Sequence, residues 1–410
     1  MKDYIWSVEQ SAARFGDRPA IISPWGMCTF SELAGMVATS CEDLRTSAGR
    51  ARVVSGPPAP RQFALLLAAR RSSTVVLPLY PGGSEERQEI ARLWEQNCAG
   101  RMGTDSRGGI AFLSSGTTGR AAVHVDRTGV GRGGRVPVFQ RYAAGAEFGP
   151  HIMSRGSYHA GIVRPALYAL EAGSTVVVNE RYEPLELERQ VIEVGASSLF
   201  LSPEQLYDFA RYSTEEMPTL ERIMFGGDYM PLWMRQVVAE KFGERLIGFY
   251  GTSVGAISEY GLSEIRRSMS VGRPYPHLQC RVVTREGRDG EVQVRRRGQA
   301  DPSIGWEPTG DVGYIDQSGN IALIGRDRWV AGTYVTDVWH QLIETEGVFA
   351  VAITARDGRN FYDVEFDDAT GAEHRVRRVV NNSSHGRHTL RFHARGTLGR
   401  TESLKVYLEQ

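Results

Sequence analysis

From Ser7 to Tyr250 the chain alternates short apolar runs with amphipathic segments of about ten residues. A strand covered on both faces reads as a continuous apolar run, whereas a helix repeats its apolar positions every three to four residues. The expected strands are Ala20–Ile22, Ile110–Leu113, 121–125, Ser174–Val178, Ser198–Leu201, Ile223–Phe225 and Leu246–Tyr250. The expected helices are Ser7–Phe15, Glu85–Gln96, Tyr158–Ala172, Leu185–Val194, Leu232–Phe242 and one beginning at Pro203. This alternation predicts an α/β sheet with many parallel strands.

The pattern is less decisive near the beginning of the chain. Phe63–Ala69 and Thr74–Leu79 are apolar runs that fit either buried strands or short helices, since periodicity does not separate the two over so few residues. Thr29–Leu33 opens a further helix. We predict Ser31 as its N-cap, because a serine hydroxyl can accept a hydrogen bond from a free amide of the first helical turn.

After Ser258 the pattern changes to shorter β segments. The expected segments are the strands Gln279–Val283 and Gly290–Val294 and a hairpin over Gly313–Ile324 that turns at Ser318 and Gly319. A smaller terminal unit from about Asp327 would contain the apolar run Val348–Thr354 and a basic stretch. We find neither internal repeats nor a low-complexity tract, so the chain reads as one large unit followed by a smaller one.

Polar or glycine-rich turns follow three of the expected strands. They are Ser114–Gly119, Gly226–Asp228 and Tyr250–Thr252. Ligands of open α/β sheets bind outside the carboxyl ends of the strands. The positions of these three turns therefore predict a ligand site at that edge of the sheet.

The turn Ser114–Gly119 contains four hydroxyl side chains and two glycines within six residues. Glycine allows the backbone to approach a ligand closely, and successive free N–H groups form a concavity that binds anions. The hydroxyls add further hydrogen-bond donors. The alternative is a polar surface loop, because serine, threonine and glycine are ordinary loop residues.

The composition excludes several functions. The 410 residues include 48 Lys+Arg and 48 Asp+Glu, so the formal net charge is zero. The overall charge therefore does not favour a nucleic acid or an anionic membrane as partner. Met1–Arg18 lacks the apolar core of a signal peptide, and no apolar run approaches the length of a membrane span. The four cysteines are scattered without metal-ligand spacing, which is typical of reduced thiols in a cytoplasmic protein.

Lysine is scarce. Only Lys2, Lys241 and Lys405 occur, so 45 of the 48 basic residues are arginine. A lysine at a chemically suggestive position is therefore less expected by chance than in an average chain.

The order of the motifs resembles that of the adenylate-forming superfamily, which includes acyl-CoA synthetases, aryl-acid ligases, luciferases and peptide-synthetase adenylation domains. The segments that carry this resemblance are Thr29–Leu33, Leu77–Leu79, Ser114–Gly119, Tyr158–Gly161, Phe225–Asp228, Tyr250–Ser253, Val271–Pro274, Gly290–Arg295, Thr309–Asp311, Gly325–Arg326 and Arg400–Lys405. It implies a large N-terminal domain over residues 1–325, with parallel-rich sheets and a β-rich subdomain. A small, mobile α+β domain over residues 326–410 would carry Lys405.

The resemblance also implies the site residues. The nucleotide would be bound by Ser114, Ser115, Gly116, Thr117, Thr118, Gly119, Gly227, Asp228, Tyr250, Gly251, Thr252, Asp311 and Arg326. The acid pocket would be formed by Tyr158, His159, Gly226, Gly227, Ser253 and Gly255. Lys405 and Thr118 would be the catalytic residues.

The chemistry agrees with these roles. Tyr250 would stack on adenine, and Asp311 can accept hydrogen bonds from both ribose hydroxyls because an ionised carboxylate only accepts. Lys405 would bridge the substrate carboxylate and the α-phosphate as a compact charge. Alternatives remain for three residues: Asp311 as a turn residue, Lys405 as a solvated lysine, and His159 as a structural histidine.

The chain departs from the family pattern at four places. Ala122 occupies the position of a phosphate-binding lysine, for which Arg120 can compensate because a guanidinium binds phosphate bidentately. Val254 occupies the position of a glutamate that binds Mg²⁺, a cation that prefers oxygen ligands, and Glu259 is a candidate replacement. Leu404 replaces a glycine, and Arg328 lies where the hinge residue is expected.

The chain is also short for the family, mainly between Leu79 and Ser114, between Ala121 and Tyr158, and in the terminal unit. The basic stretch His374–Arg395 contains His385, His388, His393 and six arginines. A solvated basic face, a metal site, and a docking surface for an acidic carrier protein or for the phosphates of CoA are the alternatives for it.

The sequence thus predicts an enzyme that uses ATP to convert an aryl or aliphatic carboxylic acid to an acyl-adenylate, with Mg²⁺ as a further cofactor. Transfer to a thiol of CoA or a carrier protein would follow. One alternative is a ligase whose acceptor is an amine. Another is a relative that binds a nucleotide or an acyl-adenylate without full turnover, as Ala122 and Val254 suggest.

Overall fold

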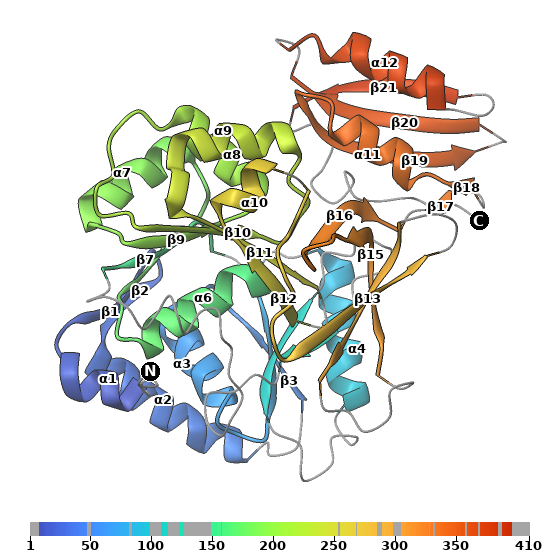
Figure 1. The fold of residues 1–410 in the computed structure, drawn as a ribbon. Helices are drawn as coiled ribbons and strands as arrows, with labels where there is room; N and C mark the ends of the chain where they lie inside the picture. The colour runs from blue at the N-terminus through green and yellow to red at the C-terminus, as the bar shows by residue number, and fades with distance from the viewer. Residues whose placement is uncertain are drawn as a thin grey trace. The chain divides into compact units, whose positions relative to one another are not determined.

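The structure is a computed structural model, and it describes residues 8–46, 51–81, 84–98, 108–113, 123–126, 149–156, 158–252, 255–267, 269–284, 289–297, 305–327, 329–330, 333–356, 359–367, 370–383 and 388–395. Backbone contacts divide the chain into two compact units (Figure 1). The first comprises Met1–Ser114 and Ala122–Phe225, and the second comprises Ser115–Ala121 and Gly226–Gln410. The boundary expected between residues 325 and 326 stays a prediction.

The main sheet of the first unit has the strand order β10-β9-β7-β8-β1-β2. The strands are β1 (Pro19–Ser23), β2 (Gly26–Thr29), β7 (His151–Met153), β8 (Val176–Val178), β9 (Ser198–Leu201) and β10 (Arg222–Gly226). Neighbouring strands are parallel except for the hairpin of β1 and β2. The prediction of a largely parallel α/β sheet is therefore confirmed.

The strand order of this sheet reverses between β7 and β9. Helix α6 (Ala160–Glu171) leads from β7 to β8 on one side, whereas α7 (Pro184–Val194) and α8 (Pro203–Tyr212) lead to β9 and β10 on the other. Right-handed crossovers in opposite directions place helices on opposite faces, and Figure 1 shows α6 on the other face from α7 and α8. Ligands of such sheets bind at this reversal, outside the carboxyl ends of the strands.

A smaller sheet of the first unit has the order β3-β4-β5-β6. Its strands are β3 (Ala51–Ser55), β4 (Val75–Leu79), β5 (Gly109–Leu113) and β6 (Val123–Asp126), and the helices of this region are α1 (Val8–Phe15), α2 (Phe30–Arg45), α3 (Pro60–Ala69) and α4 (Glu85–Cys98). Val75, Leu77 and Ala111 of the sheet and Ala91 of α4 form a fully buried cluster. The expected strand at 121–125 is thus β6, and it leads away antiparallel to β5.

Two details at the N-terminal end settle or correct the sequence prediction. The segment Phe63–Ala69 is part of α3, which starts with Pro60 in its first turn, where a proline lacks only an N–H that would stay free. The N-cap of α2 is Thr29, and the prediction of Ser31 was wrong. Thr29 accepts from the amide of Glu32, and the Glu32 carboxylate accepts from the amide of Thr29, which is a complete capping box.

The second unit begins with helices and a hairpin. These elements are α9 (Leu232–Phe242), the 3₁₀ turn η1 (Gly243–Arg245), the antiparallel strands β11 (Leu246–Thr252) and β12 (Gly255–Tyr260), and α10 (Leu262–Arg267). A four-stranded antiparallel sheet follows, with β13 (Leu278–Thr284), β14 (Gly290–Arg296), β15 (Glu307–Ile315) and β16 (Ile321–Arg326) in sequential order. The predicted hairpin turns at Asp316–Asn320, where the Asp316 carboxylate accepts from the amide of Asn320.

The last part of the second unit is a three-stranded sheet with two helices. It contains α11 (Thr336–Ile343), β19 (Val348–Arg356), β20 (Arg359–Phe366), α12 (Ala372–Ser383) and β21 (His388–Ala394), after a short pair of β17 (Trp329–Val330) and β18 (Thr333–Tyr334). Trp339, Val351, Tyr362 and Val376 are among the buried members of its core. The small α+β module that the sequence predicts is therefore present, and we call Val335–Arg395 the C-terminal module.

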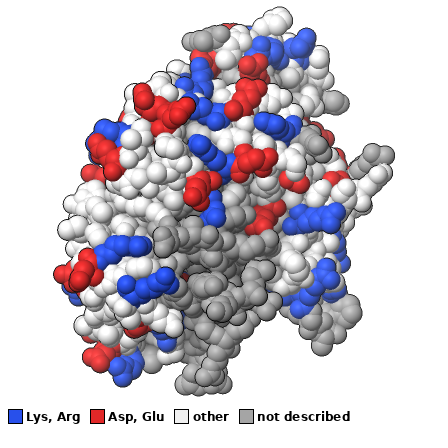
Figure 2. Space-filling view, turned by 60° about the vertical axis from the view of Figure 1, so that its left-hand side comes forward, with Lys and Arg blue, Asp and Glu red and all other residues white. Residues whose placement is uncertain are grey.

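The described surface agrees with the balanced charge of the chain. On the face shown in Figure 2, acidic and basic side chains are interspersed. Within the described part of the chain, no helix is long and apolar enough to cross a membrane.

His151, in the first position of β7, gives a testable dependence of stability on pH. Its Nδ1 lies 3.0 Å from the Ser198 hydroxyl, and complete burial lowers its pKa to about 4. The unfolded chain, with an ordinary histidine pKa of about 6.5, binds more protons in this interval, so stability falls as pH falls through it. The contribution is at most roughly 3 kcal/mol.

We therefore expect His151→Gln to reduce the loss of unfolding free energy between pH 6.5 and pH 4, as measured by urea denaturation. The exposed His374 provides a control, because His374→Gln removes a histidine without altering the core. An undiminished pH dependence in His151→Gln would refute the assignment.

Candidate nucleotide and acid site

The best-defined part of the candidate site lies in the second unit, where Tyr250 of β11 contacts Asp311 of β15. The Tyr250 hydroxyl donates a hydrogen bond of 2.8 Å to Asp311 Oδ2. Tyr250 is only 7% exposed. Burial, followed by the neighbouring Asp311 charge, raises the pKa of Tyr250 well above its ordinary value. The phenol therefore stays protonated and acts as a hydrogen-bond donor to the carboxylate.

Arg326 of β16 contacts Asp311 from the neighbouring strand. The two residues are directly paired in the β15–β16 register, and Arg326 Nη1 lies 3.1 Å from Asp311 Oδ1. The same guanidinium nitrogen donates to the carbonyl oxygen of Thr309 at 2.9 Å. Asp311 is thus held between a phenol hydroxyl and a guanidinium, and we call Tyr250, Asp311 and Arg326 the carboxylate cluster.

Thr309 supports this cluster through the backbone. Its hydroxyl donates to the carbonyl oxygen of Val292 on β14 and accepts from the amide of Asp311. From the sequence, Thr309 is notable only as the first residue of the Thr-Gly-Asp motif, and no role is predicted for its hydroxyl. Its hydroxyl helps to fix the backbone at Asp311, because these two hydrogen bonds join main-chain groups of β14 and β15.

The glycines near Tyr250 permit close approach of backbone segments. A Cβ atom on Gly226 would lie 2.5 Å from the carbonyl oxygen of Phe249, and one on Gly251 would lie 2.8 Å from that of Gly255. Such distances exclude any side chain without movement of the backbone. Glycine at these two positions therefore allows β11 to pack closely against the residues at the end of β10 and on β12.

The remaining predicted residues of this region lie nearby along the chain. Gly227 follows β10 with a φ of +91°, and Thr252 pairs with Gly255 at the end of the β11–β12 hairpin. Asp228 is exposed, and its Oδ1 accepts from the amide of Tyr229 at 2.7 Å.

Tyr158 and His159 belong to the first unit, at the start of α6. His159 is the N-cap of this helix, and its Nδ1 accepts from the amide of Gly161 at 3.3 Å. Burial, followed by the charges of Arg155, Arg164 and Arg87, lowers the pKa of His159 to about 4. A neutral imidazole whose Nδ1 accepts a hydrogen bond carries its proton on Nε2, so His159 has a structural role as the cap of this helix.

Tyr158 is partly buried, and the opposite end of α6 is buried. Among the described residues, the Tyr158 hydroxyl has no hydrogen-bond partner, and burial raises its pKa. At the other end of the helix, Glu171 accepts two hydrogen bonds of 3.1 and 3.0 Å from Arg70, with both side chains below a tenth exposed. This ion pair fixes the helix that positions Tyr158 and His159, while their place in an acid pocket stays a prediction.

Several predicted residues lie outside the described part of the chain. They are Ser114, Ser115, Gly116, Thr117, Thr118, Gly119, Ser253 and Lys405, together with the divergent positions Arg120, Ala122, Val254, Arg328 and Leu404. Their roles therefore stay predictions.

The described residues contain no group of three or more histidine, cysteine, aspartate or glutamate side chains that could hold a metal ion. Glu259, the candidate replacement ligand for Mg²⁺, lies on β12, where its Oε2 accepts from the Tyr275 hydroxyl at 3.5 Å. In the basic stretch, His393 Nε2 lies 2.8 Å from Asp363 Oδ1, and Arg391 contacts the same oxygen. Both His393 and Arg391 therefore have a carboxylate partner within the module.

Comparison with known proteins adds to this geometry. No family model matches the chain. A putative long chain fatty acid-CoA ligase, VraA, of Staphylococcus epidermidis is 26% identical over 208 residues, which are 46% of this chain and 45% of that protein. An indoleacetate–CoA ligase of Aromatoleum aromaticum is 27% identical over 220 residues, or 46% and 42% of the two chains. These matches thus cover just under half the length of each relative.

Solved structures share the fold over nearly the whole chain. The amide bond synthetase McbA from Marinactinospora thermotolerans superposes with a TM-score of 0.66 at 19% identity, covering 94% of this chain and 95% of that one. The o-succinylbenzoate CoA synthetase MenE from Bacillus subtilis, in complex with an acyl-adenylate, gives 0.70 at 15% identity, covering 99% and 97%. The chain therefore has the fold of these two adenylate-forming enzymes. Its predicted fold class is confirmed by these matches.

The carboxylate cluster makes a prediction for stability. We expect Asp311→Ala to lower the free energy of unfolding by about 1–3 kcal/mol, because it leaves the buried Tyr250 hydroxyl without its acceptor. The Arg326 contact adds less, since that side chain is 32% exposed and water screens its charge. Asp311→Asn should cost less than Asp311→Ala, because its amide oxygen still accepts from Tyr250.

Urea denaturation of the wild-type protein, Asp311→Ala and Asp311→Asn would measure these differences in the free energy of unfolding. Glu307→Ala is the matched control, since Glu307 is an exposed carboxylate on the same strand. Equal losses in Asp311→Ala and Glu307→Ala would contradict the structural role of the cluster.

Proposed function

We propose that the protein activates a carboxylic acid with ATP, forming an acyl-adenylate and releasing pyrophosphate. The observation that carries the proposal is the carboxylate cluster of Tyr250, Asp311 and Arg326 within an adenylate-forming fold. An ionised carboxylate matches the two vicinal hydroxyls of a ribose, because it can accept from both.

In the proposed reaction a substrate carboxylate oxygen attacks the α-phosphorus of ATP. The new bond joins that oxygen to phosphorus, and the bond to the bridging oxygen of the β-phosphate breaks, so that the electron pair leaves with pyrophosphate. Ser114, Ser115, Thr117 and Thr118 would hold the phosphates. Lys405 would neutralise charge between the carboxylate and the α-phosphate, where charge stabilisation contributes most.

We further propose transfer of the acyl group to a thiol of CoA or a carrier protein, with an amine as the alternative acceptor. The thiol is supported by relatives named CoA ligases, and the amine by the fold shared with an amide bond synthetase. ATP is supported by the likeness to a structure named as ATP-bound MatB from Rhodopseudomonas palustris, at 15% identity and a TM-score of 0.68. We propose an aryl or aliphatic acid as the substrate.

A second candidate function is binding of a nucleotide or an acyl-adenylate without full turnover. It is supported by Ala122 and Val254, which remove a positive charge and an oxygen ligand from positions where the family has them. Mg²⁺ would then be bound through the phosphates of ATP alone or through Glu259.

Acid-dependent exchange of labelled pyrophosphate into ATP tests the first proposal. We expect exchange with at least one acid from a panel of aryl and aliphatic carboxylates. Absence of exchange across the whole panel, with ATP binding retained in calorimetry, would favour the binding-only alternative.

Replacement of the C-terminal lysine tests the catalytic assignment. We expect Lys405→Ala to lower the exchange rate on the order of a hundredfold or more, because the charge at the reacting centre is lost. Lys241→Ala is the matched control, since Lys241 is an exposed lysine on α9. Unchanged exchange in Lys405→Ala would remove that residue from the mechanism.

Product analysis identifies the acceptor. With an accepted acid, parallel reactions with CoA, a phosphopantetheinylated carrier protein and simple amines should yield one dominant product class by mass spectrometry. A thioester as the main product supports the first proposal, and an amide supports the alternative.

A further inference from the structure

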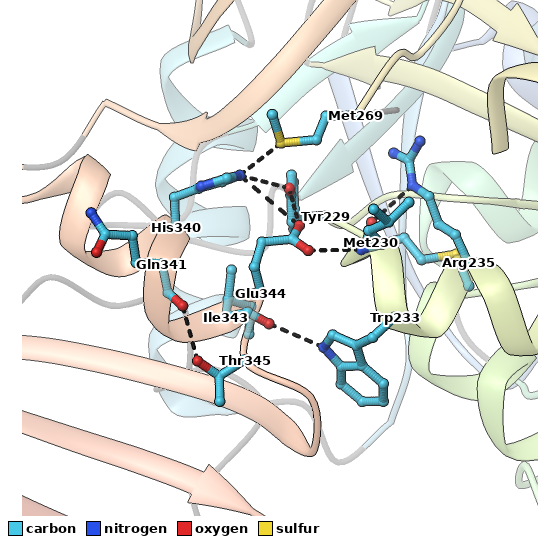
Figure 3. Close-up of polar contacts among 11 residues, drawn as sticks. Tyr229, Met230, Trp233, Arg235, Met269, His340, Gln341, Ile343, Glu344 and Thr345 are labelled. Carbon is cyan, nitrogen blue, oxygen red and sulfur yellow. Dashed lines mark hydrogen bonds and ion pairs between the residues drawn. The ribbon is translucent and has the colours of Figure 1, made fainter. Parts of the chain in front are cut away.

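Helix α9 begins beside the candidate site without a capping side chain of its own. Its N-cap is Pro231, which makes no side-chain hydrogen bond. The carboxylate of Glu344, the residue that ends α11, accepts from the amide of Leu232 at 2.9 Å (Figure 3). The C-terminal module therefore supplies the acceptor that the first turn of α9 needs, and a carboxylate is favourable there because of the helix dipole.

Tyr229 joins the same carboxylate to the glycine turn of the site. Its hydroxyl donates a hydrogen bond of 2.5 Å to Glu344 Oε1. Its ring is partly buried, packs edge-on against Trp339 at 5.6 Å between centroids and lies against the core of the C-terminal module. Tyr229 directly follows Gly227 and Asp228 in sequence, so the segment proposed to contact the nucleotide is anchored in that core.

His340 completes the arrangement on the other side of Tyr229. Its Nε2 lies 3.1 Å from the Tyr229 oxygen and 2.7 Å from Met269 Sδ, as Figure 3 shows. Burial lowers the pKa of His340 more than the nearby Glu344 raises it, so the ring is neutral at neutral pH. The Tyr229 oxygen can then donate to Glu344 while it accepts from the imidazole.

A second attachment lies at the next residue of α9. Trp233 Nε1 donates to the carbonyl oxygen of Ile343 at 3.2 Å, and its ring packs edge-on against Phe349 at 5.3 Å. The C-terminal module thus contacts both the turn before α9 and the first turn of the helix. Loosening of Glu344 would leave the Tyr229 hydroxyl and the Leu232 amide without acceptors.

We propose that Glu344 is a positioning residue that couples nucleotide binding at the Gly226–Asp228 turn to the packing of the C-terminal module against Tyr229 and the start of α9. This inference rests on the proposed function, because it assumes that the turn contacts a nucleotide. Coupling of binding free energies is reciprocal. If packing of α11 against the start of α9 strengthens nucleotide binding, the bound nucleotide must stabilise that packing by the same free energy.

Two conservative variants test the coupling. Glu344→Gln keeps the shape of the side chain but offers one acceptor oxygen for two donors, and Tyr229→Phe removes only the hydroxyl. We expect each to weaken ATP binding about fivefold or more in titration calorimetry, within the usual range of such coupling. The double variant should be no weaker than the worse single variant, because both remove the same interaction. Glu346→Gln is the control, since Glu346 is exposed two residues away.

Hydrogen exchange supplies a readout that a purely structural role would not move. In the wild-type protein, ATP should slow amide exchange over residues 336–344, and this protection should disappear in Glu344→Gln. Tyr229→Phe, which deletes a single hydroxyl, keeps the test available if Glu344→Gln does not fold.

The outcomes separate the inference from the proposed function. Wild-type protein that neither binds ATP nor exchanges pyrophosphate would overturn both. Wild-type exchange together with unchanged ATP affinity and unchanged ATP-dependent protection in both variants would overturn the coupling alone. Weaker ATP binding, lost protection and non-additivity would support it.

Discussion

The second unit is organised around a single carboxylate, because Asp311 is the point at which three elements share polar contacts. Its partners come from β11 and β16, and the Thr309 hydroxyl ties its backbone to β14. A carboxylate that is mostly removed from water needs such donors, since an uncompensated buried charge is costly.

Much of the fold could be predicted from the sequence because its strands are covered by helices and therefore read as uninterrupted apolar runs. Val176–Val178 and Ser198–Leu201 are examples, and the antiparallel sheet could be read from its shorter segments and turns. The N-cap of α2 could not be chosen by residue type alone. Thr29 and Ser31 both carry a hydroxyl, and only the reciprocal bond with Glu32 distinguishes them.

Some residues of the candidate site could likewise be predicted from the sequence, and others could not. Tyr250, Asp311 and Arg326 could be named because each lies in a short motif, and the structure brings Asp311 into contact with the other two. Glu344 could not be named from the sequence, because it lies more than a hundred residues from Tyr229, and no local pattern signals a partner at that distance. His159 shows a further limit: the motif suggested a pocket residue, while its visible hydrogen bond is a helix cap.

The packing of Tyr229 against the core of the C-terminal module has a consequence for dividing the chain. A fragment ending near residue 325 would retain Tyr229 and Trp233 but lose Trp339, Phe349 and the Glu344 carboxylate that cover or satisfy them. Such a fragment would expose two aromatic rings together with an uncapped helix end, a surface prone to self-association. A stable truncated protein would have to replace these contacts. The domain boundary expected from the motifs, between residues 325 and 326, is therefore not a position at which the chain can be cut without loss of packing.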